Sequence, residues 1–200
     1  MKRNILIVHT LFILMLLVSI GSSPALGRDW TIDVNHTTIQ FGVKHIFSTV
    51  WGHFSDFEGK IAFDPHDLAH SGFDFTVKVN SINTANGKRD THLRSNDFFS
   101  ASTFPDMHFK SEKILHKGGK DYVMVGTMTL KETSKSMEIP FTFHGVTPSP
   151  FNKKEEVIGF DTAFSINRLD FGVGTGKFFK MGVVGDMVQV SISIEAVDKK

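Results

Sequence analysis

The residues best suited to chemistry stand together in one polar segment of the sequence. Arg89, Asp90, His92 and Arg94 follow shortly after an Asn-Gly pair. Carboxylate and imidazole groups serve general acid–base chemistry, and a guanidinium beside them can hold an anion. No nucleophile with a base and an orienting group can be assembled around them, so the cluster by itself does not define an enzyme.

The same cluster also fits a structural role. Asp90 and Arg94 are spaced i, i+4 with the acid first, an order that favours a helical turn. Two adjacent phenylalanines, Phe98 and Phe99, follow shortly after. The segment 81–109 is therefore predicted to form a short helical plug over one end of a set of strands, with a polar outer layer and an aromatic underside.

Three other patterns offer weaker candidates for a site. His66 and His70 are spaced i, i+4, but they lie in a turn-forming DPHDLAH segment, so a solvated pair is the expectation and a metal site the alternative. The run VGTGK at 173–177 lacks the full phosphate-loop pattern and leads toward a strand, which favours a flexible loop. His45 ends an apolar strand face and is expected to form hydrogen bonds there rather than act as a base.

The elements that would position these residues are short strands. Phe73, Phe75 and Val77 alternate with polar residues in the clearest half-buried strand, and similar alternation recurs from residue 30 to 194. We find no long amphipathic helix after residue 27, no internal repeat and no linker. The sequence predicts an all-β, antiparallel fold of about eight strands, as a barrel or sandwich. Gly52 and Gly59 within strand patterns predict bulges or sharp bends at barrel corners.

The N-terminus predicts export. Lys2 and Arg3 precede an apolar run from 5 to 20, and small residues follow, which is the pattern of a secretory signal peptide cleaved before Arg28. Residues 1–27 are therefore expected to be removed, leaving residues 28–200 as one periplasmic domain without stable membrane insertion. The remaining 20 basic and 21 acidic residues argue against a nucleic-acid or anionic-membrane partner driven by charge. Since the chain has no cysteine, disulfides and thiolate sites are excluded.

Phenylalanine dominates the apolar residues. Of the 20 in the chain, 19 lie after residue 27, against one Tyr and two Trp. A closed eight-stranded barrel is the size that either just fills with side chains or holds one small ligand. Two interpretations therefore stay open: the rings fill the barrel, or they line a tunnel for an elongated apolar molecule.

Seven motifs in order resemble the YceI-like family of exported polyisoprenoid-binding proteins. They are Trp30-x-Ile-Asp-x-x-His36, Phe41-x-Val-Lys-His45, Gly52-His-Phe-Ser-Asp-Phe-Glu-Gly59, Arg89-Asp-x-His-Leu-Arg94, Asp97-Phe-Phe99, Phe104-Pro105 and Asn167-Arg168-x-Asp-Phe-Gly172. The resemblance runs from Trp30 to about Ala196. It departs at Lys131-Glu132, where members usually carry a glycine, so the turn geometry there is not predicted.

The resemblance implies an extended, eight-stranded, lipocalin-like antiparallel barrel whose tunnel holds a long isoprenoid or similar lipid. It also implies a periplasmic location, frequent homodimers and no established catalytic activity. No cofactor is expected beyond the bound lipid. Strand alternation then predicts the ligand-binding residues: Phe41, Val43, His45, Phe54, Phe73, Phe75, Val77, Arg94, Phe99, Phe141, Phe143, Phe160, Phe164 and Arg168.

The function predicted from this reasoning is carriage or storage of an apolar chain such as an isoprenoid quinone, a prenyl phosphate or a fatty amide. Two alternatives remain. One is an enzyme that acts on a small apolar substrate through Arg89, Asp90 and His92. The other is a stress-related module that binds metal through surface histidines such as His66.

Overall fold

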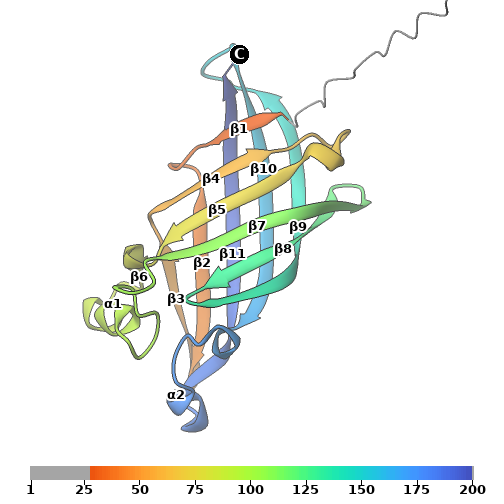
Figure 1. The fold of residues 1–200 in the computed structure, drawn as a ribbon. Helices are drawn as coiled ribbons and strands as arrows, with labels where there is room; N and C mark the ends of the chain where they lie inside the picture. The colour runs from red at the N-terminus through yellow and green to blue at the C-terminus, as the bar shows by residue number, and fades with distance from the viewer. Residues whose placement is uncertain (1–27, 200) are drawn as a thin grey trace, which may run out of the picture.

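Eight antiparallel strands close into a barrel in the computed structural model, which describes residues 28–199 (Figure 1). The ring runs in the order β1-β4-β5-β7-β8-β9-β10-β11, and β11 pairs back to β1 at Thr31↔Val197 and Ile32↔Ala196. Its strands are β1 (Asp29–Ile32), β4 (Phe57–Ala62), β5 (Gly72–Lys78), β7 (Asp106–Gly118), β8 (Asp121–Leu130), β9 (Thr133–Pro148), β10 (Glu155–Asn167) and β11 (Val184–Lys199). The predicted eight-stranded antiparallel barrel is confirmed.

Three further strands lengthen the wall at one end. The long strand β11 meets β1 near its C-terminal end, but over residues 184–193 it pairs with β2 (Thr38–His45). Beyond β2 the sheet continues through β3 (Ser48–Phe54) and the two-residue β6 (Ile82–Asn83). Because β1 and β2 pair with different ends of β11, the barrel wall extends along the length of that strand.

One end of the barrel is filled with aromatic rings. Phe63 is 1% exposed, and the rings of Phe73, Tyr122, Phe141, Phe143 and Phe160 surround it with centroids 5.1–6.1 Å away. The surrounding core cluster also holds residues of β1 and β11, so this is the end at which the eight-stranded ring closes. Burial of so many rings supplies the main apolar contribution to stability there.

The opposite end is covered by loops and short helices. The connection from β6 to β7 contains α1 (Gly87–Arg94), and η3 (Arg168–Phe171) and α2 (Lys177–Lys180) connect β10 to β11. Phe98 from the first connection packs with Leu130, Phe171 and Val173. The predicted short helical plug thus corresponds to α1 and the turns that follow it. Two more 3-10 turns, η1 (Leu68–His70) and η2 (Val79–Ser81), flank β5. Among residues 28–199, no helix has the length and apolar character that crossing a membrane requires.

The prediction of a bulge at Gly52 or Gly59 is wrong. Both pair in unbroken register, Gly52 with Phe41 and Gly59 with Phe75. A Cβ on Gly52 would lie 2.5 Å from the Phe41 ring, and one on Gly59 would lie 2.6 Å from the Phe75 ring. These glycines therefore make room for an aromatic ring laid across the neighbouring strand, and the register shifts occur elsewhere, as between Gly159 and Phe160.

Candidate functional site

A cavity of about 390 Å³ occupies the barrel between the aromatic cluster and the loop-covered end. Its floor is formed by Phe73, Phe141 and Phe160, which also belong to the filled core. Its other end is lined by His45, where β2 ends, and by Val184, where β11 begins. A volume of roughly 300–1,000 Å³ is usual for small-ligand sites, so this cavity can hold one ligand of modest size.

Most of the predicted ligand-binding residues lie on the wall of this cavity. The structure brings together Phe41, Val43, His45, Phe54, Phe73, Phe75, Val77, Phe99, Phe141, Phe160, Phe164 and Arg168. They come from five strands (β2, β3, β5, β9 and β10), from the turns after α1 and from η3, and period-two alternation is what turns the strand residues to one side. That they contact a ligand remains a prediction.

Arg94 and Phe143 lie away from the cavity wall. Phe143 packs in the filled end, with its ring 5.1 Å from that of Phe63 and 5.8 Å from that of Phe160. Arg94 is at the last position of α1, where its Nη1 lies 3.5 Å from the carbonyl oxygen of Ile82. Alternation gives the inward direction of a strand residue such as Phe143 but not its height along the barrel, and it does not apply to Arg94, which lies on a helix.

Other wall residues were not singled out in the sequence. These are mainly Ile, Val and Met from the same inward strand faces, namely Ile39, Met107, Met124, Met128, Ile139, Val188, Val190, Ile192 and Ile194. The same alternation would have found them, since Val188, Val190 and Ile192 are spaced two apart. Phe178 also lines the cavity, from α2 within the glycine-rich segment, where no periodic signal exists.

Arg168 is a buried charge at the loop-covered end of the barrel. It is 5% exposed, and its guanidinium donates to the carbonyl oxygens of Gly185 (2.8 Å), Val173 (2.7 Å) and Val184 (3.3 Å). Burial lowers the pKa of Arg168 from its ordinary value, and the negative charge of Asp186 opposes this effect. Since an arginine stays charged in proteins, the residue fastens both ends of the loop around α2 and places a positive charge beside the cavity.

The polar cluster on α1 is engaged in holding its own connection. Asp90 is buried and accepts hydrogen bonds from the amide nitrogen (2.9 Å) and hydroxyl (2.5 Å) of Thr84. Arg89 donates to the hydroxyl and the carbonyl oxygen of the same residue, both at 2.7 Å. Asn86 caps the helix by accepting from the Arg89 amide. These bonds give Asp90, Arg89 and Asn86 a structural task, while His92 Nε2 lies 2.9 Å from Asp97 Oδ2. Arg89 and His92 also line the cavity.

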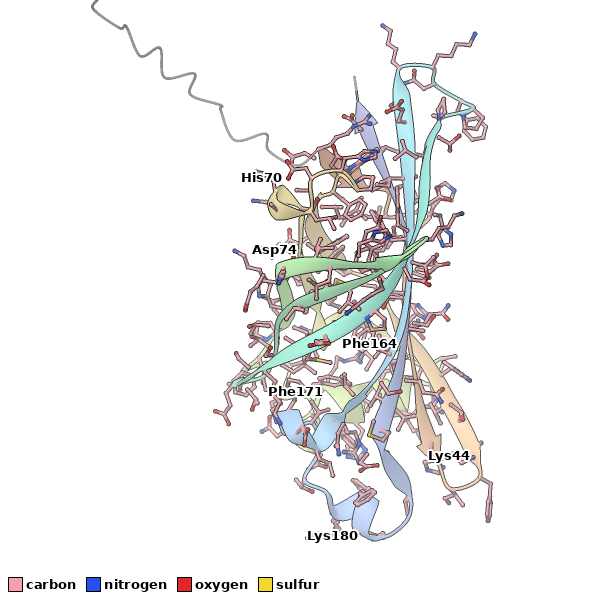
Figure 2. All side chains as sticks on the ribbon, turned by 90° about the vertical axis from the view of Figure 1, so that its right-hand side faces the viewer. Lys44, His70, Asp74, Phe164, Phe171 and Lys180 are labelled. Carbon is pink, nitrogen blue, oxygen red and sulfur yellow. The ribbon has the colours of Figure 1, made fainter. Side chains whose placement is uncertain are left out.

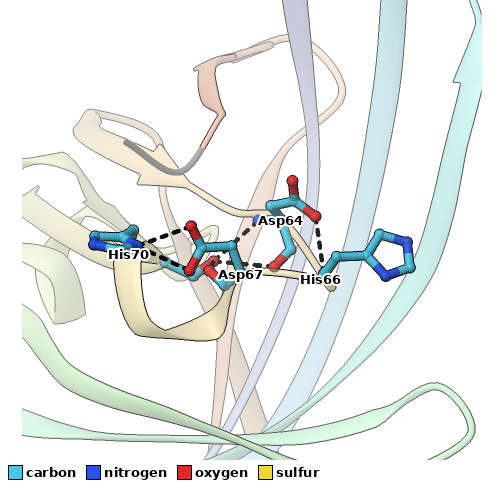
Figure 3. A network of polar contacts seen from close by, with 5 residues as sticks. Asp64, His66, Asp67 and His70 are labelled. Atoms are coloured by element: carbon cyan, nitrogen blue, oxygen red, sulfur yellow. Dashed lines mark hydrogen bonds and ion pairs between the residues drawn. The ribbon is translucent and has the colours of Figure 1, made fainter. Parts of the chain in front are cut away.

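The histidine pair in the β4–β5 connection does not converge. His70 Nδ1 contacts the carboxylate of Asp67 at 2.8 Å, while the amide nitrogen of His66 donates to Asp64. Figure 3 shows the two imidazole rings pointing in opposite directions. Within residues 28–199 no group of three or more histidine, aspartate or glutamate side chains is placed to hold a metal ion.

Known sequences and solved structures resemble this chain over most of its length. A family profile described as the YceI-like domain matches residues 30–196. A UPF0312 protein of Enterobacter sp. (strain 638) is 31% identical over 188 residues, covering 92% of this chain and 93% of that protein. A solved structure of a Campylobacter jejuni YCEI protein is 34% identical, with a TM-score of 0.68, and covers 78% of this chain and 90% of that one.

A more distant structure shares the fold. It is described as a polyisoprenoid binding domain from Saccharophagus degradans implicated in plant cell wall breakdown, and it matches with a TM-score of 0.64 at 11% identity. The match covers 86% of this chain and 98% of that one. At this identity the likeness is one of architecture.

Proposed function

The chain belongs to the YceI-like domain family, and on this premise we propose that it is an exported protein that holds the chain of an isoprenoid or similar long lipid in its barrel. The observation that carries the proposal is the apolar cavity, closed at one end by aromatic rings and reaching the loop-covered end at the other. The polyisoprenoid-binding description of a protein with the same fold supports this choice of ligand class.

In such a site, the lipid chain contributes more binding free energy than the head group does. Each buried CH₂ contributes roughly 0.8 kcal/mol before the costs of association, so a few prenyl units outweigh a single polar contact. Cavity length and width would then decide which chains are accepted. Isoprenoid quinones, prenyl phosphates and fatty amides all carry an apolar chain of this kind.

A head group would lie at the end of the cavity where polar side chains gather. His45 and Arg168 line that end, whereas the opposite end is occupied by phenylalanine rings. We propose that the ligand enters chain first, so that its polar group stays near these two residues. The protein then carries or stores the lipid in the periplasm and performs no reaction on it.

A pair of neighbouring substitutions on β11 tests the proposal. Val190 lines the cavity, and Ser191, the next residue, is exposed on the outer face. Val190→Phe puts a ring into the cavity and should weaken uptake of a long-chain isoprenoid quinone about tenfold or more, because an overfilled site accepts the chain only with strain. Native mass spectrometry after incubation with the quinone measures the bound fraction.

Ser191→Phe is the matched control, since it adds the same ring to the same strand outside the barrel. It should bind the quinone as the unmodified protein does. Equal uptake by a folded Val190→Phe variant would show that the cavity is not where the lipid lies.

A further inference from the structure

The loop-covered end of the barrel, which the cavity reaches, carries an unusual set of exposed apolar side chains. The two-residue turn between β2 and β3 consists of Ile46, 50% exposed, and Phe47, 93% exposed. Beside it, Phe179 and Met181 at the end of α2 are 44% and 61% exposed. The amide nitrogen of Ile46 donates to the carbonyl oxygen of Val183 at 3.0 Å, so the turn and the α2 loop form one continuous surface. We call residues 44–47 and 177–181 the mouth surface.

Ile46 and Phe47 are unusual residues for a solvent-exposed hairpin turn. Ile46 has φ +52°, a left-handed conformation that is rare for a β-branched residue and is usually filled by glycine or asparagine in such hairpins. Glycine in its place would relieve the backbone, and a polar side chain at position 47 would be better solvated. The sequence instead places two apolar side chains at the tip, of which Phe47 is almost fully exposed and Ile46 half exposed.

Positive charge surrounds these apolar groups. Lys44, His45, Lys177 and Lys180 belong to the same two segments, and neither residues 43–50 nor residues 172–185 include an acidic residue. Figure 2 shows Lys44 and Lys180 at the same end of the molecule. The overall charge balance of the chain predicted no anionic-membrane partner, but that balance does not show where the charges lie. In the folded barrel, Lys44 and Lys180 lie at the mouth (Figure 2), and the segments that carry them contain no carboxylate.

We propose that the mouth surface docks the protein on a lipid bilayer that contains anionic phospholipids. Exposed aromatic and aliphatic side chains enter the head-group region, and lysines around them attract anionic lipids, as in other proteins that bind membrane surfaces without spanning them. The inference rests on the proposed function. Because the cavity reaches the same end through His45, Phe178 and Val183, docking would place its opening against the bilayer, so that a lipid chain could pass between membrane and barrel without crossing water.

Vesicle flotation tests the docking directly. A chain that begins at Arg28 includes every barrel strand and excludes the apolar N-terminal run. It is mixed with vesicles of phosphatidylcholine alone or of phosphatidylcholine with phosphatidylglycerol. We expect the protein to float with the second kind, and Lys177→Gln with Lys180→Gln to reduce this partitioning roughly 30-fold, about fivefold for each lysine.

The aromatic contribution is tested with a matched pair at the two ends of the barrel. Phe151 is 97% exposed and lies in the β9–β10 connection, next to Lys153 and Lys154 and at the end opposite to the mouth. Phe47→Ser should lower partitioning about tenfold, whereas Phe151→Ser should leave it unchanged. Equal losses in both variants, or an unmodified protein that ignores both kinds of vesicle, would overturn the proposal.

Two further readouts separate this proposal from its rivals. Bound lipid is measured in each variant by mass spectrometry: Phe47→Ser should still hold lipid, and a protein that holds lipid but never floats contradicts the docking alone. An unmodified protein without lipid contradicts the proposed function instead. Analytical ultracentrifugation shows whether the surface pairs two copies, since a dimer that Phe47→Ser dissociates would assign the surface to self-association.

Discussion

Asp161 and His144 face each other on the outer surface of neighbouring strands, with 2.8 Å between Oδ2 and Nε2. A hydrogen bond from Ser193 lowers the pKa of Asp161 below its ordinary value, and the bond to His144 lowers it further, while burial opposes both. A carboxyl whose pKa is lower in the folded state stabilises the fold above its unfolded pKa and loses this effect as the pH falls through the folded value.

The expected result is a pH dependence of stability that Asp161 helps to set. Between about pH 5 and pH 2, the free energy of unfolding of the unmodified protein should fall more steeply than that of Asp161→Asn, which cannot take up the proton. Denaturant unfolding at several pH values measures both curves. His144→Gln, which keeps the Ser193 bond, should retain part of the steeper slope, and parallel curves for all three proteins would contradict the assignment.

Single residues show what alternation can and cannot predict. The inward direction of Phe41, Phe75 and Phe164 follows from period two, and all three lie on the cavity wall. Whether an inward ring lines the cavity or fills the closed end depends on its height in the barrel, which separates Phe164 from Phe143. The partners of Asp90 and Arg89 depend on Thr84, whose position beside them arises only when the connection folds.

At the level of elements, Gly52 fixes how β3 lies against β2. A methyl group there would meet the Phe41 ring at 2.5 Å and the Thr84 methyl at 2.8 Å, so one of them must move. Gly52→Ala should therefore lower the free energy of unfolding by about 1–3 kcal/mol, as overpacking does elsewhere, and should displace the Phe41 ring from the cavity wall. Chemical denaturation measures the first effect and quinone uptake the second.

Gly87 provides the comparison for that substitution. It begins α1, and a Cβ there would meet nothing within 4 Å. Gly87→Ala should leave stability unchanged or raise it slightly, because alanine is the better helix former. If both alanine variants were equally stable, the close approach of Phe41 to β3 would not be a constraint on the fold.

The β8–β9 hairpin shows why element geometry is only partly predictable from the sequence. The β8–β9 turn has Lys131 at φ +53°, where a glycine is usual, and its Nζ bonds the carbonyl oxygens of Gly172 (2.8 Å) and Phe98 (3.2 Å). These bonds to distant segments hold a conformation that the local sequence disfavours. Strand existence and order follow from local pattern, whereas such turns depend on tertiary contacts.

For the whole molecule, the excess of phenylalanine has a divided role. Rings around Phe63 fill the end where β1 closes on β11, and rings such as Phe41 and Phe164 line the hollow part. Composition left both interpretations open because the same residue type serves both ends. The placement of Lys44 and Lys180 at the same end of the molecule (Figure 2) is likewise a property of the folded chain, absent from its net charge. The predicted signal peptide, residues 1–27, lies outside the residues that the structure describes.

Mass spectrometry of an organic extract of the protein, purified from a bacterial periplasm, tests the central claim most directly. If the cavity holds a lipid chain, the extract contains a long-chain isoprenoid or similar lipid in near-stoichiometric amount, and Val190→Phe yields much less of it. An extract without lipid, from a protein that also takes up no added prenyl quinone, would contradict the claim and would assign the hollow part of the barrel another purpose.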